Sequence, residues 1–303
     1  MSLEQLLNES LPATSYGHRA DLGVIGLTGP DSAKFLQGQA TADIKLVDDQ
    51  HSVFGAVCTP KGRIIANFFV LKNGTESYLL VAKQDVIDTL LTHLKKYAVF
   101  FKTSLEDVSG QYNISSMFAR TEQLTPQEQY AQAIPTSHQE GCSQLTLDNT
   151  YFRQTLTIAA AQEELPDAED ESAHQVMTLL AARPLLGQAH VESILPQWIN
   201  MHRNGGISFT KGCYTGQEIV ARMKYRGKSK KHLALISSSA PLEVDADVVN
   251  GEGKTIGSVF ASAAIDDLHV AQIMLNIDQE EVDQAFVNDQ TVELLPLPYQ
   301  IGS

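Results

Sequence analysis

The amino-acid sequence predicts an α+β protein that ends in a small β-barrel. Over the first ~110 residues, segments with strand character alternate with two amphipathic helices, which is typical of helices packed on one face of an antiparallel sheet. After Lys231 the pattern changes to short strands separated by turn signals, with no helix of convincing length. The chain has 303 residues, of which 43% are hydrophobic. We therefore expect one large domain or two, with a sizeable core.

The elements of the first part follow from periodicity and turn residues. Strands are predicted at Leu22–Pro30 and Ala98–Val108, and three more within 52–82, where "TPKG" and the Asn-Gly of "KNGT" mark the turns. A short helix is predicted at Asp31–Gly38, which starts with an acid and stops at a glycine. A longer helix is predicted at Gln84–Tyr97, where apolar residues recur at helical spacing.

The second part of the chain contains a similar order of elements. Strands are predicted at 111–119, 142–148 and 151–161, and a helix at 173–182. An acidic loop, "LPDAEDES", leads into that helix. The short strands of the C-terminal part are "HLALISSS", "GKTIGSVFASAA", "LHVAQIMLN" and "TVELLPL".

This order of elements predicts the domain organisation. The two similar series suggest an internal repeat of about 1–110 and 111–200. Both would belong to a first domain at 1–231, and a β-barrel would occupy 232–303.

The segment "KGCYTGQE" is the most informative stretch of the chain. Its members are Lys211, Gly212, Cys213, Tyr214, Thr215, Gly216, Gln217 and Glu218. Thr215 and Glu218 fit a capping box, so that Thr215 is the expected N-cap of a helix. Cys213 would then be accessible in a loop just before that helix, whose positive end, together with Lys211, favours the thiolate. The alternative is that Cys213 is a small buried hydrophobic residue, as free cysteines often are.

A basic segment surrounds and follows this loop. The basic residues are Lys211, Arg222, Lys224, Arg226, Lys228, Lys230 and Lys231. With Glu218 as the single acid the segment carries a charge of +6, whereas the whole chain carries −14. A local basic patch on an acidic protein indicates a defined anionic partner. The alternative is a solvated helix end, because cations are favoured at helix C-termini.

Several other classes of site fit the sequence poorly. Three scattered cysteines argue against a disulfide framework and against a metal or cluster site owned by the protein. "RGKS" lacks the first glycine of a phosphate-binding loop, and no spacing pairs Cys213 with His190 or His202 as a catalytic base. The N-terminus lacks the features of a secretory signal, and no apolar run reaches the ~18 residues of a membrane span. The expected localisation is cytoplasmic.

The segment Leu195–Lys228 resembles the signature of the YgfZ family. The match consists of the eight-residue block Lys211–Glu218 and the "VAR" of Val220–Arg222. Weaker similarities to the family are "FLQGQATADI", "LKKYAVF" and the final "LPLPY". These are folate-binding proteins related to the aminomethyltransferase (T-protein) of glycine cleavage. The resemblance therefore implies a T-protein-like, folate-binding region of ferredoxin-like α/β layers with a C-terminal β-barrel.

The resemblance also implies ligands and partners. It implies tetrahydrofolate or a derivative as the cofactor, with apolar contacts from Leu22 and Val176 and polar contacts from Gln197 and Asn200. Its implied role is support of iron–sulfur enzymes or of their assembly proteins, including enzymes that modify tRNA. Cys213 would be the functional thiol of this role, and no membrane is involved.

Two departures from T-proteins bear on catalysis. T-proteins carry an Asp pair where this chain has Ala66 and Asn67, and a glutamate that holds the pterin where it has Ala182 or Arg183. The resemblance therefore implies a fold without aminomethyl transfer and without a stand-alone reaction.

Two alternative functions remain open at the level of sequence. One is a folate-dependent one-carbon transferase, against which the missing carboxylates argue. The other is a tRNA-binding module that uses the basic patch, although the sequence places only Tyr214 and Tyr225 beside that patch as aromatic stacking groups.

Overall fold

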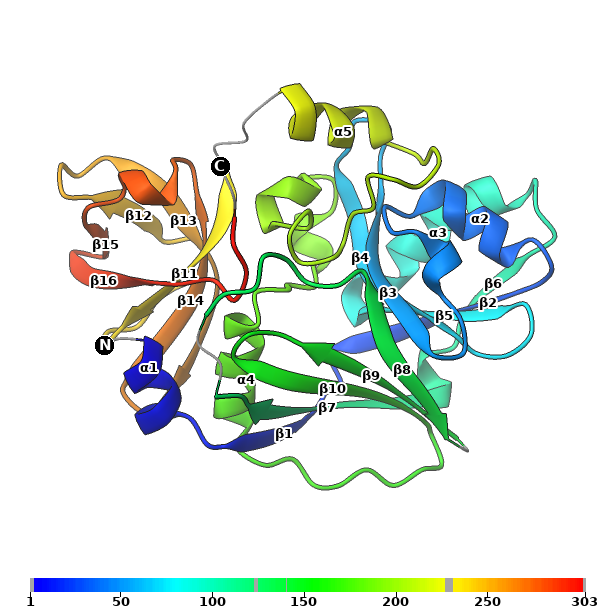
Figure 1. Cartoon of the computed structure of the whole chain (residues 1–303), viewed down its shortest axis with the longest axis horizontal. Helices are drawn as coiled ribbons and strands as arrows, with labels where there is room; N and C mark the ends of the chain where they lie inside the picture. Colours follow the sequence, from blue (N-terminus) through cyan, green and yellow to red (C-terminus); the bar gives the residue numbers. More distant parts are fainter. Residues whose placement is uncertain (1–2, 123–124, 140, 227–230, 302–303) are drawn as a thin grey trace.

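The computed structural model of the chain describes residues 3–122, 125–139, 141–226 and 231–301. Within these ranges, ten strands form one sheet whose neighbouring strands are all antiparallel, and six further strands form a closed barrel (Figure 1). Helices pack beside the sheet, as in an α+β fold. The predicted fold class and the C-terminal barrel are thus confirmed.

The strands of the ten-stranded sheet are β1 Thr14–His18, β2 Leu22–Thr28, β3 His51–Cys58, β4 Ile64–Lys72, β5 Ser77–Lys83, β6 Ser104–Asp107, β7 Tyr112–Arg120, β8 Ala133–Gln139, β9 Cys142–Asp148 and β10 Phe152–Ala160. The α-helices are α1 Leu3–Gln5, α2 Ser32–Gln39, α3 Ile87–Ala98, α4 Glu171–Leu180 and α5 Gln217–Arg226. A π-helical turn at Leu6–Ser10 continues α1, and short 3₁₀ turns include Gln84–Val86 before α3 and Pro196–Ile199.

The ten-stranded sheet consists of two halves with the same strand order. One half runs β3-β4-β5-β2-β6 and the other β8-β9-β10-β7-β1, and β3 pairs with β8 where they meet. In chain order, β2 to β5 are followed by α3, and β7 to β10 are followed by α4. The edge strand is the exception, because β6 follows α3 whereas β1 comes before β2; a tandem repeat would therefore account for four strands of each half but not for the edge strand.

Strand β3 is buried on both faces, which explains its continuous apolar sequence. Phe54, Ala56 and Cys58 point to a core shared by the two halves, where they join Ile134 of β8. Val53 and Val57, which alternate with them, point to a second core, which α2 and α3 cover. Because the first core lies between the halves, it holds them together.

Helix α3 buries Ile87, Leu90 and Leu94, which belong to the apolar pattern from which the helix was predicted, and also Ala98. The strand predicted immediately after this helix, at 98–108, exists, but its predicted first residue was wrong. The chain leaves α3 by a turn, in which the backbone N–H of Phe101 donates to the carbonyl of Ala98 at 2.8 Å, and β6 begins only at Ser104.

The barrel strands are β11 His232–Ser238, β12 Asp247–Asn250, β13 Thr255–Ile265, β14 Leu268–Leu275, β15 Ala285–Val287 and β16 Gln290–Leu295. The barrel closes in the order β11-β14-β13-β12-β15-β16, and α4 packs between it and β1 (Figure 1). The sequence did not indicate β1, β8, β12 or β15. In the described part of the chain, no helix has the length and apolar character needed to cross a lipid bilayer.

Candidate functional site

The ammonium group of Lys211 anchors the start of the signature loop, defined as residues Lys211–Glu218. Its Nζ donates three hydrogen bonds, to the carbonyl oxygens of Gln37 (2.8 Å), Ala40 (2.7 Å) and Ala42 (2.8 Å). These carbonyls lie at and just after the C-terminal end of α2, where free acceptors and the helix dipole favour a cation. Burial lowers the pKa of Lys211 to about 8, so the group is still a cation at pH 7.

The other end of the signature loop packs against the turn between β3 and β4. Gly216 has a φ of +85°, and a Cβ on it would lie 2.6 Å from the carbonyl oxygen of Thr59 in that turn. Next to it, Tyr214 is buried, and the backbone N–H of Thr215 donates to the carbonyl of Gly38 at 3.2 Å. The loop is therefore fixed on two sides, by α2 and by the β3–β4 turn.

The predicted capping box was wrong in register. Helix α5 begins at Gln217, so Gly216 rather than Thr215 precedes it. Within the described part of the chain, the side chain of Thr215 makes no hydrogen bond to the backbone of Glu218. The positive φ of Gly216 sets the entry into the helix instead.

The tip of the signature loop is exposed. Cys213 is exposed, and a Cβ on neighbouring Gly212 would have no atom within 4 Å. The other two cysteines differ: Cys58 is buried, which raises the pKa of its thiol to about 12, and Cys142 is partly buried. The prediction of an accessible Cys213 in a loop before a helix is confirmed, whereas its chemical role stays a prediction.

The structure describes part of the predicted basic patch. Arg222 and Lys224 of α5 and Lys231 just before β11 are exposed, whereas Lys211 is buried beneath the loop. The side chain of Arg226, and Lys228 and Lys230 altogether, lie outside the described residues.

A separate cavity of about 390 Å³ lies between the two halves of the sheet, α4 and the barrel. Its apolar wall is formed by Leu22, Phe69, Leu156, Leu179, Leu185 and Phe260. Its main polar lining residues are Arg19, Lys83, Asp85, Arg183, His190 and Gln272. An apolar cavity with a few polar groups is typical of small-molecule sites, and this volume is within their usual range.

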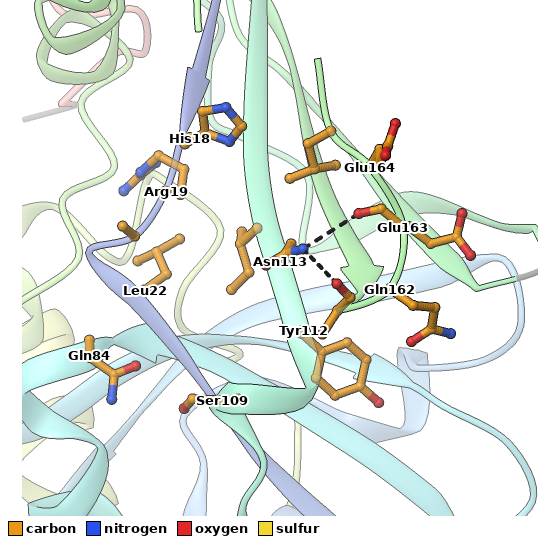
Figure 2. Close-up of a pocket in the computed structure, with 15 residues that line it drawn as sticks. His18, Arg19, Leu22, Gln84, Ser109, Tyr112, Asn113, Gln162, Glu163 and Glu164 are labelled. Atoms are coloured by element: carbon orange, nitrogen blue, oxygen red, sulfur yellow. Dashed lines mark hydrogen bonds between the residues drawn. The ribbon is translucent and has the colours of Figure 1, made fainter. Parts of the chain in front are cut away.

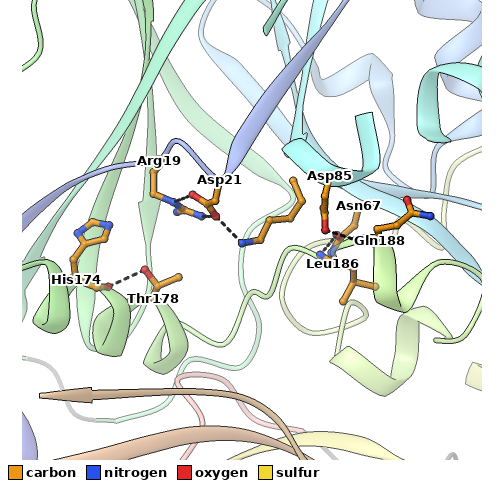
Figure 3. Close-up of polar contacts among 9 residues, drawn as sticks. Arg19, Asp21, Asn67, Asp85, His174, Thr178, Leu186 and Gln188 are labelled. Carbon is orange, nitrogen blue, oxygen red and sulfur yellow. Dashed lines mark hydrogen bonds and ion pairs between the residues drawn. The ribbon is translucent and has the colours of Figure 1, made fainter. Parts of the chain in front are cut away.

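A charged network forms one rim of this cavity (Figure 3). Asp21 accepts hydrogen bonds from Nε of Arg19 at 2.8 Å and from Nζ of Lys83 at 2.6 Å. Burial alone would raise the pKa of Asp21, but the hydrogen bonds and charges of Arg19 and Lys83 hold it far below its usual value. The network therefore fixes two cations at the cavity edge.

Gln272 of β14 is one of the polar residues that line the cavity. Its Nε2 donates to the carbonyl of Leu179 at 2.8 Å, which fixes the orientation of the amide. Its Oε1 is buried and finds no hydrogen-bond donor among the described residues. A buried acceptor without a partner is costly, and because this oxygen is also shielded from the cavity, a ligand there would not reach it in the present side-chain orientation.

A second, larger hollow of about 910 Å³ adjoins the first through Arg19 and Leu22 (Figure 2). Its wall includes Tyr112 and Asn113 of β7, and Asn113 Nδ2 donates to the carbonyl of Ala161 at 3.1 Å. Leu22 therefore borders both hollows.

Comparison with known proteins identifies the family. The N-terminal domain model of the GCVT family matches residues 19–117. The tRNA-modifying protein YgfZ of Vibrio atlanticus is 30% identical over 97% of this chain and 95% of its own length. That of Escherichia fergusonii is 31% identical over 93% and 92%. The chain belongs to the YgfZ family. The crystal structure of the glycine cleavage aminomethyltransferase T from Bartonella henselae has the same fold, with a TM-score of 0.70 and 14% identity over 98% of this chain and 89% of that chain.

In this YgfZ-family protein, Asn67 has a structural role at the position where the T-protein resemblance places an aspartate. Its Nδ2 donates to the carbonyl of Pro184 at 2.8 Å, and its Oδ1 accepts from the backbone N–H of Leu186 at 2.8 Å (Figure 3). Both partners belong to the segment that forms one cavity wall. An ionised aspartate could not donate the first of these bonds, so the amide suits the position.

The second departure places a cation on the cavity wall. Ala182 has a φ of +49°, and its carbonyl accepts from the hydroxyl of Tyr299 at 3.0 Å. Arg183, next to it, donates from Nε to the carbonyl of Asn204 at 3.2 Å and lies 4.5 Å from the ring centroid of Tyr130. Burial lowers the pKa of Arg183. No carboxylate pairs with Arg183 in the described part of the chain.

The residues predicted to contact folate lie in different places. Leu22 lines the cavity, but Val176 is fully buried in α4 and is not part of the lining. Gln197 donates to the carbonyl of Val220 at 2.7 Å, and Asn200 to that of Leu233 at 2.9 Å. Gln197 thus connects the 3₁₀ turn at Pro196–Ile199 to α5, and Asn200, at the end of that turn, connects it to strand β11 of the barrel. Both amides have a structural function.

Sequence reasoning missed most of the cavity lining. His190, Phe260 and Gln272 carry no local motif, because the 3₁₀ turn at Gln188–His190, β13 and β14 bring them together from distant parts of the chain. Among the described residues, no group of three or more His, Cys, Asp or Glu side chains could hold a metal ion.

Proposed function

We propose that this protein is a folate-binding accessory protein that supports the assembly or repair of iron–sulfur enzymes, including enzymes that modify tRNA. The observation that carries the proposal is the central cavity, whose volume and apolar walls suit a pteridine. Membership of the YgfZ family supports the link to tRNA modification. The scattered cysteines support a cytoplasmic, reducing environment.

Within this proposal, the cavity binds tetrahydrofolate and Cys213 acts elsewhere. Cys213 is not part of the cavity lining. The turn that holds the signature loop precedes Ile64, and Phe69 lies five residues further along β4, ~17 Å away at the rise of an extended strand. Folate would therefore act on the protein's conformation or on a partner, without direct contact with the thiol.

Calorimetry with tetrahydrofolate tests the cavity. Phe260→Ala removes a ring from the wall and should weaken binding by about tenfold, because a buried aromatic contact contributes ~1–2 kcal/mol. Phe100→Ala is the matched control, since Phe100 is 83% exposed and remote from the lining. Absence of measurable binding by the unaltered protein at millimolar ligand would refute this part of the proposal.

Complementation of a strain that lacks the protein tests the thiol. Cys213→Ser should abolish support of iron–sulfur enzymes while tetrahydrofolate binding stays unchanged, because the side chain is exposed and outside the cavity. Cys142→Ser is the control and should complement fully. Full complementation by Cys213→Ser would show that the thiol is dispensable.

The alternative is a folate-dependent aminomethyl transfer. The amide at Asn67 and the Ala182–Arg183 pair supply no carboxylate at the positions where the T-protein resemblance places them. We therefore expect no turnover when the protein is incubated with tetrahydrofolate and an aminomethyl donor. Steady formation of methylenetetrahydrofolate would favour the transferase.

A further inference from the structure

Two aromatic rings lie among the cations that border the signature loop. The guanidinium of Arg63 and the ammonium of Lys231 each lie 4.7 Å from the ring centroid of Trp198. The ammonium of Lys224 lies 3.8 Å from the ring centroid of Phe209. We call these five residues the basic-aromatic face.

Distant segments of the chain build this face. Arg63 follows the β3–β4 turn, Trp198 lies in the 3₁₀ turn at Pro196–Ile199, and Phe209 lies just before the signature loop. The other two members are on α5 and at the start of the barrel, and Figure 1 shows α5 beside the turn end of β3 and β4. The sequence alone therefore placed no Trp or Phe beside the basic patch.

The rings are suited to contact with another molecule. Trp198 and Phe209 are only partly buried, at the edge of the core between the sheet halves. Arg63 is held in place by a hydrogen bond from Nη1 to the carbonyl of Ser193 at 2.5 Å. The face thus has half-exposed aromatic surfaces with cations already positioned on them.

The charge around the face is positive although the whole chain carries −14. Lys61, in the β3–β4 turn, and Arg222, on α5, are both exposed. Gly62 brings the two elements together, because a Cβ on it would lie 2.9 Å from Ile219 of α5. A local concentration of cations on an acidic protein attracts a polyanion to this face.

We propose that the basic-aromatic face binds single-stranded RNA. Positive charge alone would suit any polyanion, including an acidic protein surface. Aromatic rings beside cations favour a nucleic acid, because a flexible lysine can leave a ring face to contact a phosphate while a base stacks in its place. This inference goes beyond folate binding and does not depend on it.

The test uses the full chain and a 5′-fluorescein-labelled 12-nucleotide oligouridylate, with binding followed by fluorescence anisotropy over a range of salt concentrations. Phe209→Leu keeps the charge and removes a stacking surface, so affinity should fall about fivefold or more with an unchanged salt dependence. Lys224→Gln should weaken binding and lower the slope of log Kd against log salt by about 0.7. Phe100→Leu and Lys95→Gln, which change the same residue types on and after α3, should bind as the unaltered protein does.

Two further measurements keep the proposal open to refutation. Polyglutamate of matched charge should compete poorly with the RNA. If it competes equally well and Phe209→Leu has no effect, the face binds acidic polypeptides and the proposal is wrong. No binding of the RNA at 50 mM salt would also overturn it. The same variants should bind tetrahydrofolate as the unaltered protein does. A loss of RNA binding can then be distinguished from a failure of the folate-binding proposal.

Discussion

Lys211 shows how one buried side chain can anchor a loop while another residue of the same loop, Cys213, stays exposed. Its ammonium satisfies three carbonyl oxygens at the end of α2, while Cys213, two residues later, is open to solvent. An exposed thiol on a mobile loop would sample many positions. Anchoring the residues on both sides restricts those positions without covering the sulfur.

We predict that Lys211→Met destabilises the protein by about 2–3 kcal/mol, because it leaves buried carbonyls without a charged donor. Lys34→Met is the matched control, since Lys34 is exposed on α2, the helix at whose end the Lys211 ammonium binds. This replacement should change the free energy of unfolding by less than about 0.5 kcal/mol. Urea unfolding curves of both variants provide the measurement. Equal stability of the two variants would mean that water replaces the ammonium at low cost.

The signature loop and the β3–β4 turn act together as one structural element. Gly216 and Gly62 allow them to approach, since a Cβ on Gly216 would lie 2.6 Å from the carbonyl oxygen of Thr59, and a Cβ on Gly62 would lie 2.9 Å from Ile219 of α5, just after the loop. The same motif contains Gly212, which has open space around it. Of the two glycines in "KGCYTG", Gly216 is therefore required by the close packing, whereas the space around Gly212 would accommodate a side chain.

We predict that Gly216→Ala costs about 2 kcal/mol or more, because it combines a positive φ with a backbone clash. Gly212→Ala should change stability by less than about 0.5 kcal/mol. Thermal unfolding of the two variants tests this, with the reactivity of Cys213 towards a maleimide as a second readout. A neutral Gly216→Ala would show that the turn can move away.

The sequence predicted elements whose signal is local. Helix α3 was predictable because Ile87, Leu90 and Leu94 repeat at helical spacing within one segment. Strand β8 was missed because "AIPTSHQ" is polar and contains Pro135, and it becomes a strand only by pairing with β3 and β9. Burial of its alternate residues is a property of the assembled sheet.

The same contrast holds for the candidate sites. The exposed position of Cys213 was predictable, because glycines and a following helix are adjacent to it in sequence. The partners of Lys211 were not, because they lie about 170 residues earlier in the chain. The family resemblance pointed to the cavity only at Leu22 and Arg183, since its other walls come from elements that long-range packing brings together.

The ten-stranded sheet and the barrel share one core. A single apolar cluster includes Leu6 after α1, Phe152 of β10, Val176 and Leu180 of α4, and Leu235 of the barrel. Polar contacts extend this joint, because the hydroxyl of Tyr151 donates to the carbonyl of Pro296 at 2.9 Å. We therefore expect the barrel to depend on the sheet for its stability.

Acid should weaken this joint through His174, which lies on α4. Its Nε2 is 2.7 Å from the hydroxyl of Ser116, and burial, aided by the charge of Arg19, lowers its pKa to about 4. The unfolded chain takes up a proton below the ordinary pKa of about 6.5 and the folded one only near 4, so stability falls as the pH drops between these values. The loss amounts to at most about 3 kcal/mol.

His174→Gln should flatten this part of the stability curve, whatever its effect at neutral pH. Urea unfolding at pH 7, 5.5 and 4.5 measures the slope, and His269→Gln on the barrel is the control. An unchanged slope in His174→Gln would show that other groups cause the acid sensitivity.

The shared core also predicts cooperative unfolding, with Tyr299 as the connecting residue. Its hydroxyl donates to the carbonyl of Ala182 at 3.0 Å and accepts from Nδ2 of Asn200 at 3.3 Å. Tyr299→Phe should therefore cost about 1–2 kcal/mol, while Tyr112→Phe, which loses only an exposed bond to Asn73, should cost less than about 0.5 kcal/mol. Urea unfolding can be followed by the fluorescence of Trp198, on the sheet side, and by the far-UV circular dichroism of the whole chain. We expect both signals to change at the same urea concentration. In Tyr299→Phe, both midpoints should shift by the same amount. Separate midpoints would mean that the barrel unfolds independently, because the apolar cluster and Tyr299 would then be too weak to couple it to the ten-stranded sheet.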